Sequence, residues 1–188
     1  SALYRVQFPL ADSAIDLQLI NDPVAEIACR DYFARQFYQH CMQQSAQRRG
    51  TGYSGIISID EPGQCILQRS SVMIQQDQLE VRFFIGLPAQ GRIIDAGLAL
   101  KMLLQELPQI VRHSLQRSHT DSTQLLRHIH TALDAHNLRN QLVERGLLAF
   151  IADGSILPRA SSSSDAPLLT GRIIAFQSPD NLRVRLSL

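Results

Sequence analysis

The sequence predicts an α+β fold: a small mixed or antiparallel sheet, a helical middle segment and a C-terminal β-hairpin. Three observations support this. Apolar and polar residues alternate from Tyr4 to Leu10, as in a half-buried strand. Across the middle, apolar residues recur at helical spacing, for example Leu125, Ile129 and Leu133. Short β-prone segments separated by turn-forming residues precede and follow this helical part.

The first half of the chain is predicted to hold one long helix and a small meander. Asp22 can cap free backbone amides and Pro23 suits the first helical position, so a helix is expected from there to about Gln47. A glycine-rich basic loop, Arg48 to Gly55, comes next. The strands expected after it are 56–60, 65–67, 71–75 and 79–87, with turns at 61–63 and 76–77.

The second half is predicted to be helical first and extended later. Helices are expected at 91–106 and 107–118, and Asp121 caps a third. Residues 137–144 continue or restart that third helix, and Gly146 ends it. The later expected segments are a buried strand at 147–151, a solvated loop at 161–167, and strands at 172–176 and 182–188 joined by 178–181.

Composition is that of an ordinary globular protein. The 188 residues are 45% hydrophobic and 19% charged, with a net charge of +1, so bulk electrostatics alone does not predict attraction to nucleic acid or membrane. Lys101 is the only lysine, and every other basic residue apart from histidine is arginine. Either the genome favours arginine, or the protein uses its bidentate contact with phosphate or carboxylate.

The cysteines and the apolar runs bear on the compartment. Cys29, Cys41 and Cys65 form no CxxC pair and are odd in number, so we expect reduced thiols and a cytoplasmic location. No signal peptide is expected at the start, and no apolar run reaches the length of a membrane span.

The loop Gly50-Thr-Gly-Tyr-Ser-Gly55 matches the GxGxxG pattern of dinucleotide-binding proteins. That fingerprint needs a strand before the glycines and a helix after them, and here the predicted order is reversed. We therefore reject a Rossmann site. Two interpretations stay open: a flexible connection, or a phosphate-binding loop in which Arg48 and Arg49 lie beside exposed glycine amides such as that of Gly52.

Several familiar catalytic and metal-binding patterns are missing from the sequence. It has no GxxxxGK(S/T) P-loop and no nucleophile elbow. His128 and His130 are two residues apart on a predicted helix, so they point to different faces rather than to one zinc ion. We therefore assign no catalytic residue and no metal ligand to this chain, and we do not expect it to be an enzyme by itself.

The segment Asp153-Gly-Ser155 predicts a tight turn after a buried strand. Gly154 suits a positive φ, Asp153 can accept hydrogen bonds from turn amides, and Arg159 lies on the extended segment that leaves the turn. This is either a structural turn with a surface arginine, or a turn and an arginine presented to a phosphate or a partner domain.

Five segments form a distinctive set. They are Arg5-Val-Gln-Phe-Pro9, Gly50-Thr-Gly-Tyr-Ser-Gly-Ile-Ile-Ser-Ile-Asp-Glu-Pro-Gly-Gln64, Val81-Arg-Phe-Phe-Ile-Gly-Leu-Pro-Ala-Gln-Gly-Arg92, Leu107-Pro-Gln-Ile-Val111 and Gly146-Leu-Leu-Ala-Phe-Ile-Ala-Asp-Gly-Ser-Ile-Leu-Pro-Arg159. Through them, the chain from about Val6 to its end resembles the N-terminal region of the predicted ATPases of the ABC class. It departs from that family in lacking the P-loop, Walker B and signature motifs, and an Asp-His segment ahead of the first strand.

In the family that the chain resembles, the N-terminal domain precedes an ABC-type ATP-binding core. A segment like Phe176 to Leu188 leads into that core, so the resemblance implies that the chain is the front part of a larger protein. ATP and Mg²⁺ would then belong to the intact parent and not to this chain. The resemblance also makes Phe176 a candidate for stacking on adenine, and Arg92 and Arg159 candidates for contact with nucleotide, nucleic acid or the core.

The resemblance implies an accessory N-terminal domain at 1–160, a serine-rich linker at 161–170 and the first strands leading into the core at 171–188. Our first hypothesis is that the intact protein binds and hydrolyses ATP and acts on RNA or another nucleic acid. Its partners would be the C-terminal ATPase core and a second copy, with no membrane involved. The alternative is a self-contained protein- or nucleic-acid-binding domain with no nucleotide role. The candidate nucleotide- or nucleic-acid-binding residues are Arg48, Arg49, Gly52, Arg92, Gly154, Ser155, Arg159 and Phe176.

Overall fold

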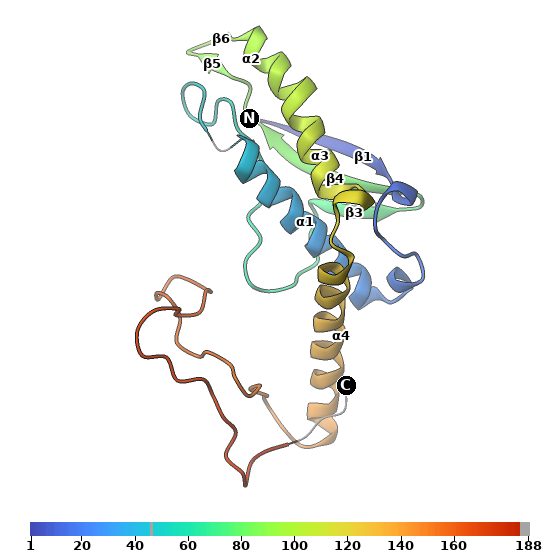
Figure 1. Ribbon diagram of the computed structural model, residues 1–188, viewed down its shortest axis with the longest axis vertical. Coiled ribbons are helices and arrows are strands. Elements are labelled where there is room, and N and C mark those ends of the chain that lie inside the picture. Colours follow the sequence, from blue (N-terminus) through green and yellow to red (C-terminus); the bar gives the residue numbers. More distant parts are fainter. Residues whose placement is uncertain (46, 185–188) are drawn as a thin grey trace. The chain divides into compact units, whose positions relative to one another are not determined.

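The computed structural model describes residues 1–45 and 47–184. It divides into two compact units, Ser1–His130 and Thr131–Leu188, which we describe separately. The elements in chain order are β1 (Ala2–Pro9), η1 (Leu10–Asp12), η2 (Leu19–Asn21), α1 (Pro23–Ser45), β2 (Ile57–Ser58), β3 (Val72–Gln75), β4 (Gln78–Ile85), β5 (Ala89–Gln90), β6 (Ile93–Ile94), α2 (Ala96–Lys101), η3 (Met102–Glu106), α3 (Leu107–Leu115), η4 (Arg117–His119) and α4 (Ser122–Glu144) (Figure 1). The fold class is mixed α+β with small antiparallel sheets, which confirms the prediction.

The main sheet is organised around β4. β1 pairs antiparallel with β4 along its whole length, with Val6 opposite Val81. On the other edge, β3 pairs with the first half of β4, and Ile57 of β2 lies opposite Ile85 near its end. The predicted turn at 76–77 is confirmed, and Gln76 adopts a φ of +49° there. Such a φ is uncommon for a residue other than glycine, so this turn is strained.

The core lies between one face of the sheet and α1. Alternate β4 side chains, among them Leu79, Val81 and Phe83, are fully buried on this face, as their period of two requires. Phe37 of α1 packs on Phe83 with ring centroids 5.2 Å apart. α3 in turn packs against α1. Phe33, Phe37 and other apolar residues of α1 are buried, so this helix supplies one side of the core.

The opposite face of the sheet carries charge. Glu80 is almost fully buried there because Arg82 and Arg5 cover it: its carboxylate lies 2.8 Å from Arg82 Nε and 3.6 Å from Arg5 Nη1. The hydrogen bond from Arg82, together with the charges of both arginines, holds the pKa of Glu80 below its usual range even though burial opposes this. The sheet is therefore apolar on one face and closed by ion pairs on the other.

The predicted strand at 65–67 does not form, and the meander is shorter than expected. Arg35 of α1 donates to the carbonyl oxygens of Gly63 and Cys65, at 2.7 and 3.0 Å. Arg30 likewise donates to the carbonyls of Arg69 and Val72, both at 2.8 Å. Side chains of α1 therefore satisfy carbonyl groups of this connection, so it crosses the helix as a loop and needs no strand partner.

The prediction of one helix from Gly91 to Glu106 is wrong at its start. Gln90 pairs with Ile93, so Gly91, at φ +62°, and Arg92 form the turn of a short β5–β6 hairpin. α2 begins only at Ala96, where the Asp95 carboxylate accepts from the Leu98 amide at 3.0 Å. A π-helical turn, η3, then connects α2 to α3, and α3 ends at Leu115, before the expected Ser118. The signal that would have placed this boundary is Asp95, a good N-cap residue.

The helix caps predicted from the sequence are confirmed. Asp22 accepts from the amides of Val24 and Ala25, and Asp121 accepts from those of Thr123 and Gln124. Residues 137–144 continue α4 without a break, and Gly146 follows its end with a φ of +65°. The boundary between the two units falls inside α4.

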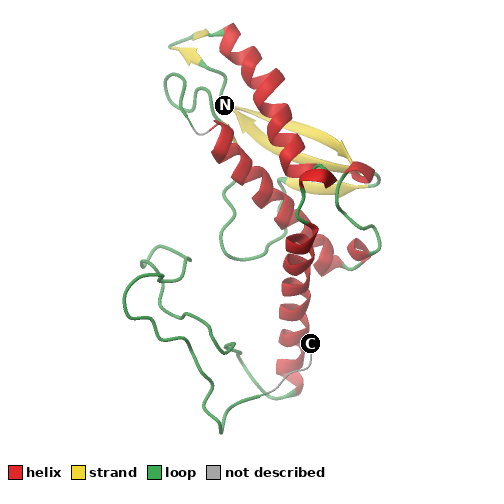
Figure 2. Cartoon of the chain, in the orientation of Figure 1, coloured by secondary structure: helices red, strands yellow, loops and turns green. Residues whose placement is uncertain are grey.

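The predicted strands of the second unit are not present among its described residues. Residues 147–151 and 172–176 are irregular, and so are 182–184 (Figure 2), whereas 185–188 lie outside the described residues. The C-terminal β-hairpin is therefore a correction to the predicted fold. Phe176 exchanges backbone hydrogen bonds with Gly154 and Ser155 instead, so this segment is joined to the 153–155 turn.

None of the helices among the described residues combines the length and the apolar character that crossing a membrane needs.

Candidate functional site

The loop Arg48–Gly55, which we call the glycine loop, folds back on itself. The Arg49 amide donates to the Ser54 carbonyl at 2.8 Å, and the Ser54 amide donates to the Thr51 carbonyl at 3.2 Å. Gly50, Gly52 and Gly55 all adopt positive φ angles, of +142°, +63° and +78°. Only glycine takes such angles without strain, which explains why the loop needs three of them.

The glycine loop is seated on the segment that follows β4. The Gly55 amide donates to the Gly86 carbonyl at 2.6 Å, and the Gly86 amide donates to the Ile56 carbonyl at 2.9 Å. A Cβ at Gly86 would lie 1.9 Å from the Tyr53 carbonyl oxygen, and one at Gly50 would lie 2.2 Å from that of Ala89. Two of the five distinctive sequence segments, 50–64 and 81–92, thus meet backbone to backbone.

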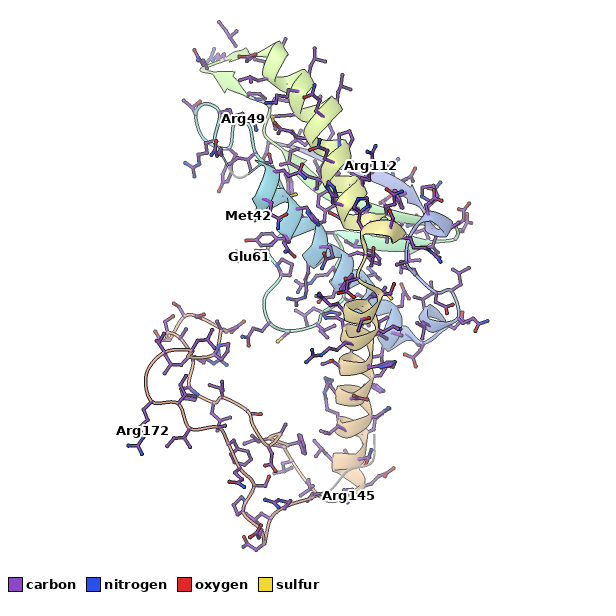
Figure 3. The ribbon with its side chains drawn as sticks, viewed as in Figure 1. Met42, Arg49, Glu61, Arg112, Arg145 and Arg172 are labelled. Atoms are coloured by element: carbon purple, nitrogen blue, oxygen red, sulfur yellow. The ribbon has the colours of Figure 1, made fainter. Side chains whose placement is uncertain are left out.

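Arg49 fixes this loop to the helical layer. Its guanidinium forms a bidentate pair with Glu106 of η3, with Nη2–Oε1 and Nη1–Oε2 distances of 2.9 and 3.0 Å. Glu106 is buried, and a buried carboxylate needs such a partner. Arg49, the half-buried arginine labelled in Figure 3, is therefore committed to a structural ion pair, which reduces its availability to a phosphate.

Two other arginines remain exposed on the same surface. The Arg48 guanidinium carbon lies 5.9 Å from the centre of the Tyr53 ring, and the Tyr53 side chain is 68% exposed. Arg92 is exposed in the turn of the β5–β6 hairpin, whose Ala89 touches the glycine loop. We call the glycine loop together with Gly91 and Arg92 the motif surface. Its exposed guanidinium groups and aromatic ring are the kinds of group that bind phosphates and stack on bases.

The order of elements excludes a dinucleotide-binding loop, as the sequence predicted. The long helix α1 precedes the glycines, and the short strand β2 follows them. The dinucleotide fingerprint requires a helix that begins directly after the glycines, and here a strand follows them instead. Sequence reasoning missed Tyr53, although an aromatic residue inside a basic glycine loop was a readable signal.

Three predicted site residues meet in the second unit. The Gly154 amide donates to the Phe176 carbonyl at 2.7 Å, and the Phe176 amide donates to the Ser155 carbonyl at 2.8 Å. Gly154 has a φ of +85°, as the predicted turn requires. The half-buried Phe176 lines a hollow of about 240 Å³ together with apolar neighbours such as Phe150 and Leu182.

Asp153 binds the segment that follows Phe176 to the 153–155 turn. Its Oδ1 accepts from both the amide and the hydroxyl of Ser178, each at 2.6 Å, and these hydrogen bonds lower the pKa of the Asp153 carboxyl. Arg159 lies 3.1 Å from Asp165 in an exposed pair within the same unit. Arg48, Arg49 and Arg92 belong to the other unit.

Two family models match the chain, one after the other. Residues 1–118 match the N-terminal domain of the ATPases of the ABC class, and residues 121–188 match the P-loop domain of the same ATPases. The chain belongs to the ABC-class ATPase family. The first match alone covers more than half of its length and contains the whole motif surface. No curated protein matches the chain.

The P-loop ATPase domain family uses nucleotide and Mg²⁺ in general, so we asked whether this ABC-class chain has residues that fit them. Among the described residues, no three His, Cys, Asp or Glu side chains are grouped closely enough to hold a metal ion. Burial, followed by the charge of Glu26, raises the pKa of Cys29 to about 12, and burial raises that of Cys41 to about 12. Both thiols are therefore protonated at neutral pH, and sulfur is not a ligand that Mg²⁺ prefers, so neither cysteine is a candidate Mg²⁺ ligand.

Proposed function

We propose that this chain is the accessory N-terminal part of an ABC-class ATPase whose intact form binds and hydrolyses ATP with Mg²⁺. The observation that carries the proposal is the pair of family matches in the order N-terminal domain, then P-loop domain. We assign the chemistry of the nucleotide to an ABC-type core in the same protein. We place the intact protein in the cytoplasm, where the free thiols of Cys29, Cys41 and Cys65 stay reduced.

Within this proposal, residues 1–160 form the accessory domain, 161–170 a linker and 171–188 the beginning of the core. Gly154, Ser155 and Phe176 lie at the approach to that core. The Phe176 ring, which lines a hollow, is the group in this segment that could meet an adenine. Homodimer formation by the intact protein is also part of the proposal.

The nucleic-acid role rests on the motif surface. It presents Arg48 and Arg92 as exposed cations, with Tyr53 exposed between glycines. Single-stranded RNA offers phosphates to the guanidinium groups and bases to the ring, and this combination is common in proteins that bind single strands. We therefore propose RNA as the partner of this surface.

A second candidate function is a self-contained binding domain without a nucleotide role. Exposed apolar side chains favour it: Ile93 of β6 is 78% exposed and Leu104 of η3 is 70% exposed. Apolar groups left uncovered in this way are typical of a protein-interaction surface.

ATP turnover distinguishes the two functions. ADP release is measured for the 188-residue chain and for the intact protein in which the chain is joined to an ABC-type core. We expect turnover from the intact protein and none above background from the 188-residue chain. Turnover by the 188-residue chain, or a complete lack of ATP binding by the intact protein, would contradict the proposal, and the second result would favour the self-contained binding domain.

Removal of both exposed cations from the motif surface tests the RNA partner. The double variant R48A/R92A is expected to bind a single-stranded RNA oligonucleotide about tenfold more weakly near 0.1 M salt, because two phosphate contacts are lost. The slope of log K against log salt should fall by about 1.4, at roughly 0.7 for each contact. Fluorescence anisotropy at several salt concentrations measures both quantities.

The matched control is R112A/R139A, which removes two exposed arginines outside the motif surface. It has the same change in net charge as the test variant. Equal weakening in both variants would show that only bulk charge matters, and unchanged binding by R48A/R92A would exclude the motif surface as the RNA site.

A further inference from the structure

A hollow of about 650 Å³ lies at the end of the main sheet that is farthest from the motif surface. The segment after β1, the β3–β4 turn and one arginine line it. The lining residues are Pro9, Leu10, Ala11, Ala14, Ile15, Asp16, Leu17, Gln18, Gln76, Asp77 and Arg117. The β3–β4 turn precedes β4 and Gly86 follows it, so the eight residues of β4 separate the two places by about 25 Å. The hollow is therefore separate from the proposed RNA surface.

The floor of the hollow is apolar and well ordered by hydrogen bonds. Leu10 and Ile15 are each only 4% exposed. Ser13, which is fully buried, donates from its hydroxyl to the Leu10 carbonyl at 2.7 Å and accepts from the Ile15 amide at 3.2 Å. The Leu10 amide donates to the Asp77 carbonyl at 2.7 Å, which ties the segment after β1 to the β3–β4 turn. Leu17, which lines the hollow and is 59% exposed, offers apolar surface to an aliphatic or aromatic group.

The rim carries one unpaired guanidinium. Arg117 Nε donates to the Ser13 carbonyl at 2.9 Å, which fixes the side chain in place. Within residues 1–45 and 47–184, no carboxylate lies within ion-pair distance of Arg117, so its two Nη groups have no acidic partner. A guanidinium anchored through Nε presents its Nη donors to a carboxylate with little loss of side-chain entropy.

Two carboxylates share the rim with Arg117. Asp16 accepts from the Gln18 amide at 2.9 Å, which holds its carboxylate in a fixed position, and Asp77 lies in the β3–β4 turn. Two negative charges beside one positive charge disfavour a phosphate or any other polyanion. A ligand with one carboxylate and one ammonium group would instead give Arg117 a negative partner and the two aspartates a positive one.

The β3–β4 turn forms one edge of the hollow. Gln76 is the one non-glycine residue with a positive φ among those that the structure describes, and it lines the hollow next to Asp77. A two-residue hairpin turn requires such a φ, so the hairpin itself accounts for it.

We propose that this hollow binds a free α-amino acid with an apolar side chain. Its carboxylate pairs with Arg117, its ammonium group lies between Asp16 and Asp77, and its side chain packs on Leu17. The site is a small-molecule binding site in addition to the proposed ATPase and RNA functions, and it does not depend on either of them.

The test uses the 188-residue chain and four probes. Isothermal titration calorimetry is carried out with L-leucine and L-phenylalanine, and with two leucine derivatives, N-acetyl-leucine and leucinamide. We expect saturable binding of at least one amino acid, and binding at least about tenfold weaker for each derivative, because each lacks one of the two charges. Binding of neither amino acid up to about 10 mM would overturn the proposal, as would equal binding of a derivative.

Variants at the rim locate the site. R117K keeps the positive charge but loses the paired N–H donors of the guanidinium, so leucine should bind about tenfold more weakly. D77N keeps the backbone carbonyl that accepts from the Leu10 amide. It should lower the affinity for leucine by about tenfold and leave the affinity for N-acetyl-leucine unchanged. R112K, at an exposed arginine that lines a different hollow, is the matched control and should bind leucine normally.

Circular dichroism reports whether each variant is folded. If R117K does not fold, D77N decides the outcome, since its change leaves the backbone contact in place. Unchanged leucine affinity in a folded D77N would overturn the proposed ammonium site. Equal weakening by R112K would place the binding elsewhere on the chain and would overturn the proposal.

Discussion

Replacement of Asp31 with asparagine is expected to lower the free energy of unfolding by about 3 kcal/mol. Asp31 is a fully buried residue of α1, and its carboxylate accepts from Arg35 Nε and Arg69 Nε at 2.6 Å each. It also accepts from His128 of α4 at 3.1 Å and from the Leu67 amide at 3.3 Å. One carboxylate thus joins α1 to the loop after β2 and to the N-terminal part of α4.

Asparagine at position 31 would leave the buried arginine groups without a charged partner. Its amide nitrogen would also face N–H donors that need an acceptor. The estimate sits at the low end of values for broken buried ion pairs, because the Arg35 and Arg69 side chains are 28% and 16% exposed and partly hydrated. Urea unfolding at pH 7 measures the change.

The pH dependence of stability gives a second readout for Asp31. Burial by itself would raise the pKa of this carboxyl, but hydrogen bonds from His128, Arg35 and Arg69 and the charge of Arg35 lower it well below its usual range. The lowered pKa stabilises the fold fully above the unfolded value of about 3.9, and this contribution is lost as the pH falls toward the folded value. The wild-type chain should therefore lose more stability than D31N between about pH 4 and pH 2.

The matched control for Asp31 is R35A, which removes one of the three side chains that bond to Asp31 and keeps the carboxylate. R35A should lower the free energy of unfolding by clearly less than D31N does, because Arg69 and His128 still bond to Asp31. A D31N variant as stable as the wild type, with the same acid-unfolding profile, would show that the buried carboxylate does not stabilise this fold.

Replacement of Gly86 with alanine is expected to cost about 3 kcal/mol of stability, near the upper end of typical overpacking effects. The added Cβ would lie 1.9 Å from the Tyr53 carbonyl oxygen and 2.7 Å from the carbonyl carbon. These atoms belong to the backbone of the glycine loop, so no side-chain rotation can relieve the contact. The loop would have to move away, with loss of the hydrogen bonds between Gly86 and residues 55 and 56.

Gly97 provides the matched control, since it is also a glycine to which one methyl group is added. It lies in α2, and its added Cβ would meet only the Asp95 carboxylate at 3.5 Å. Alanine is favoured over glycine in a helix by up to about 1 kcal/mol, so G97A should be neutral or stabilising. Thermal and urea unfolding of the two variants compare them directly, and a G86A variant as stable as G97A would refute the close packing of the glycine loop.

Local patterns predicted the elements whose signal lies within a few residues. Asp22, Asp121 and Gly146 marked helix ends, and the alternation in β1 marked a strand, because caps and periodicity act over a few residues. The candidate site was predicted less completely. The glycine loop and its arginines were identified, yet the sequence did not reveal that Arg49 is paired with Glu106, 57 residues away.

The errors share a cause. Residues 65–67 and 147–151 have the composition of strands, but a strand forms only where another offers a ladder of hydrogen bonds. The arginines of α1 satisfy the carbonyls of the first connection, and no strand pairs with the second among the described residues. The β5–β6 hairpin was missed for the converse reason, since the turn at Gly91 and Arg92 looked like the start of the helix that begins five residues later.

The sequence alone established the α+β class, the helix boundaries with strong caps, and membership of the ABC-class ATPases, since each depends on local pattern or on a long specific motif. Only the tertiary structure decided which arginines are free. Arg35, Arg49 and Arg69 are held by buried carboxylates, whereas Arg48 and Arg92 remain exposed and Arg117 has no acidic partner among the described residues. The physical reason is that a charge is neutralised by whatever the fold brings within a few ångströms. Asp31 lies one helical turn from Arg35, but the partners of Arg49 and Arg69 lie 57 and 38 residues away along the chain.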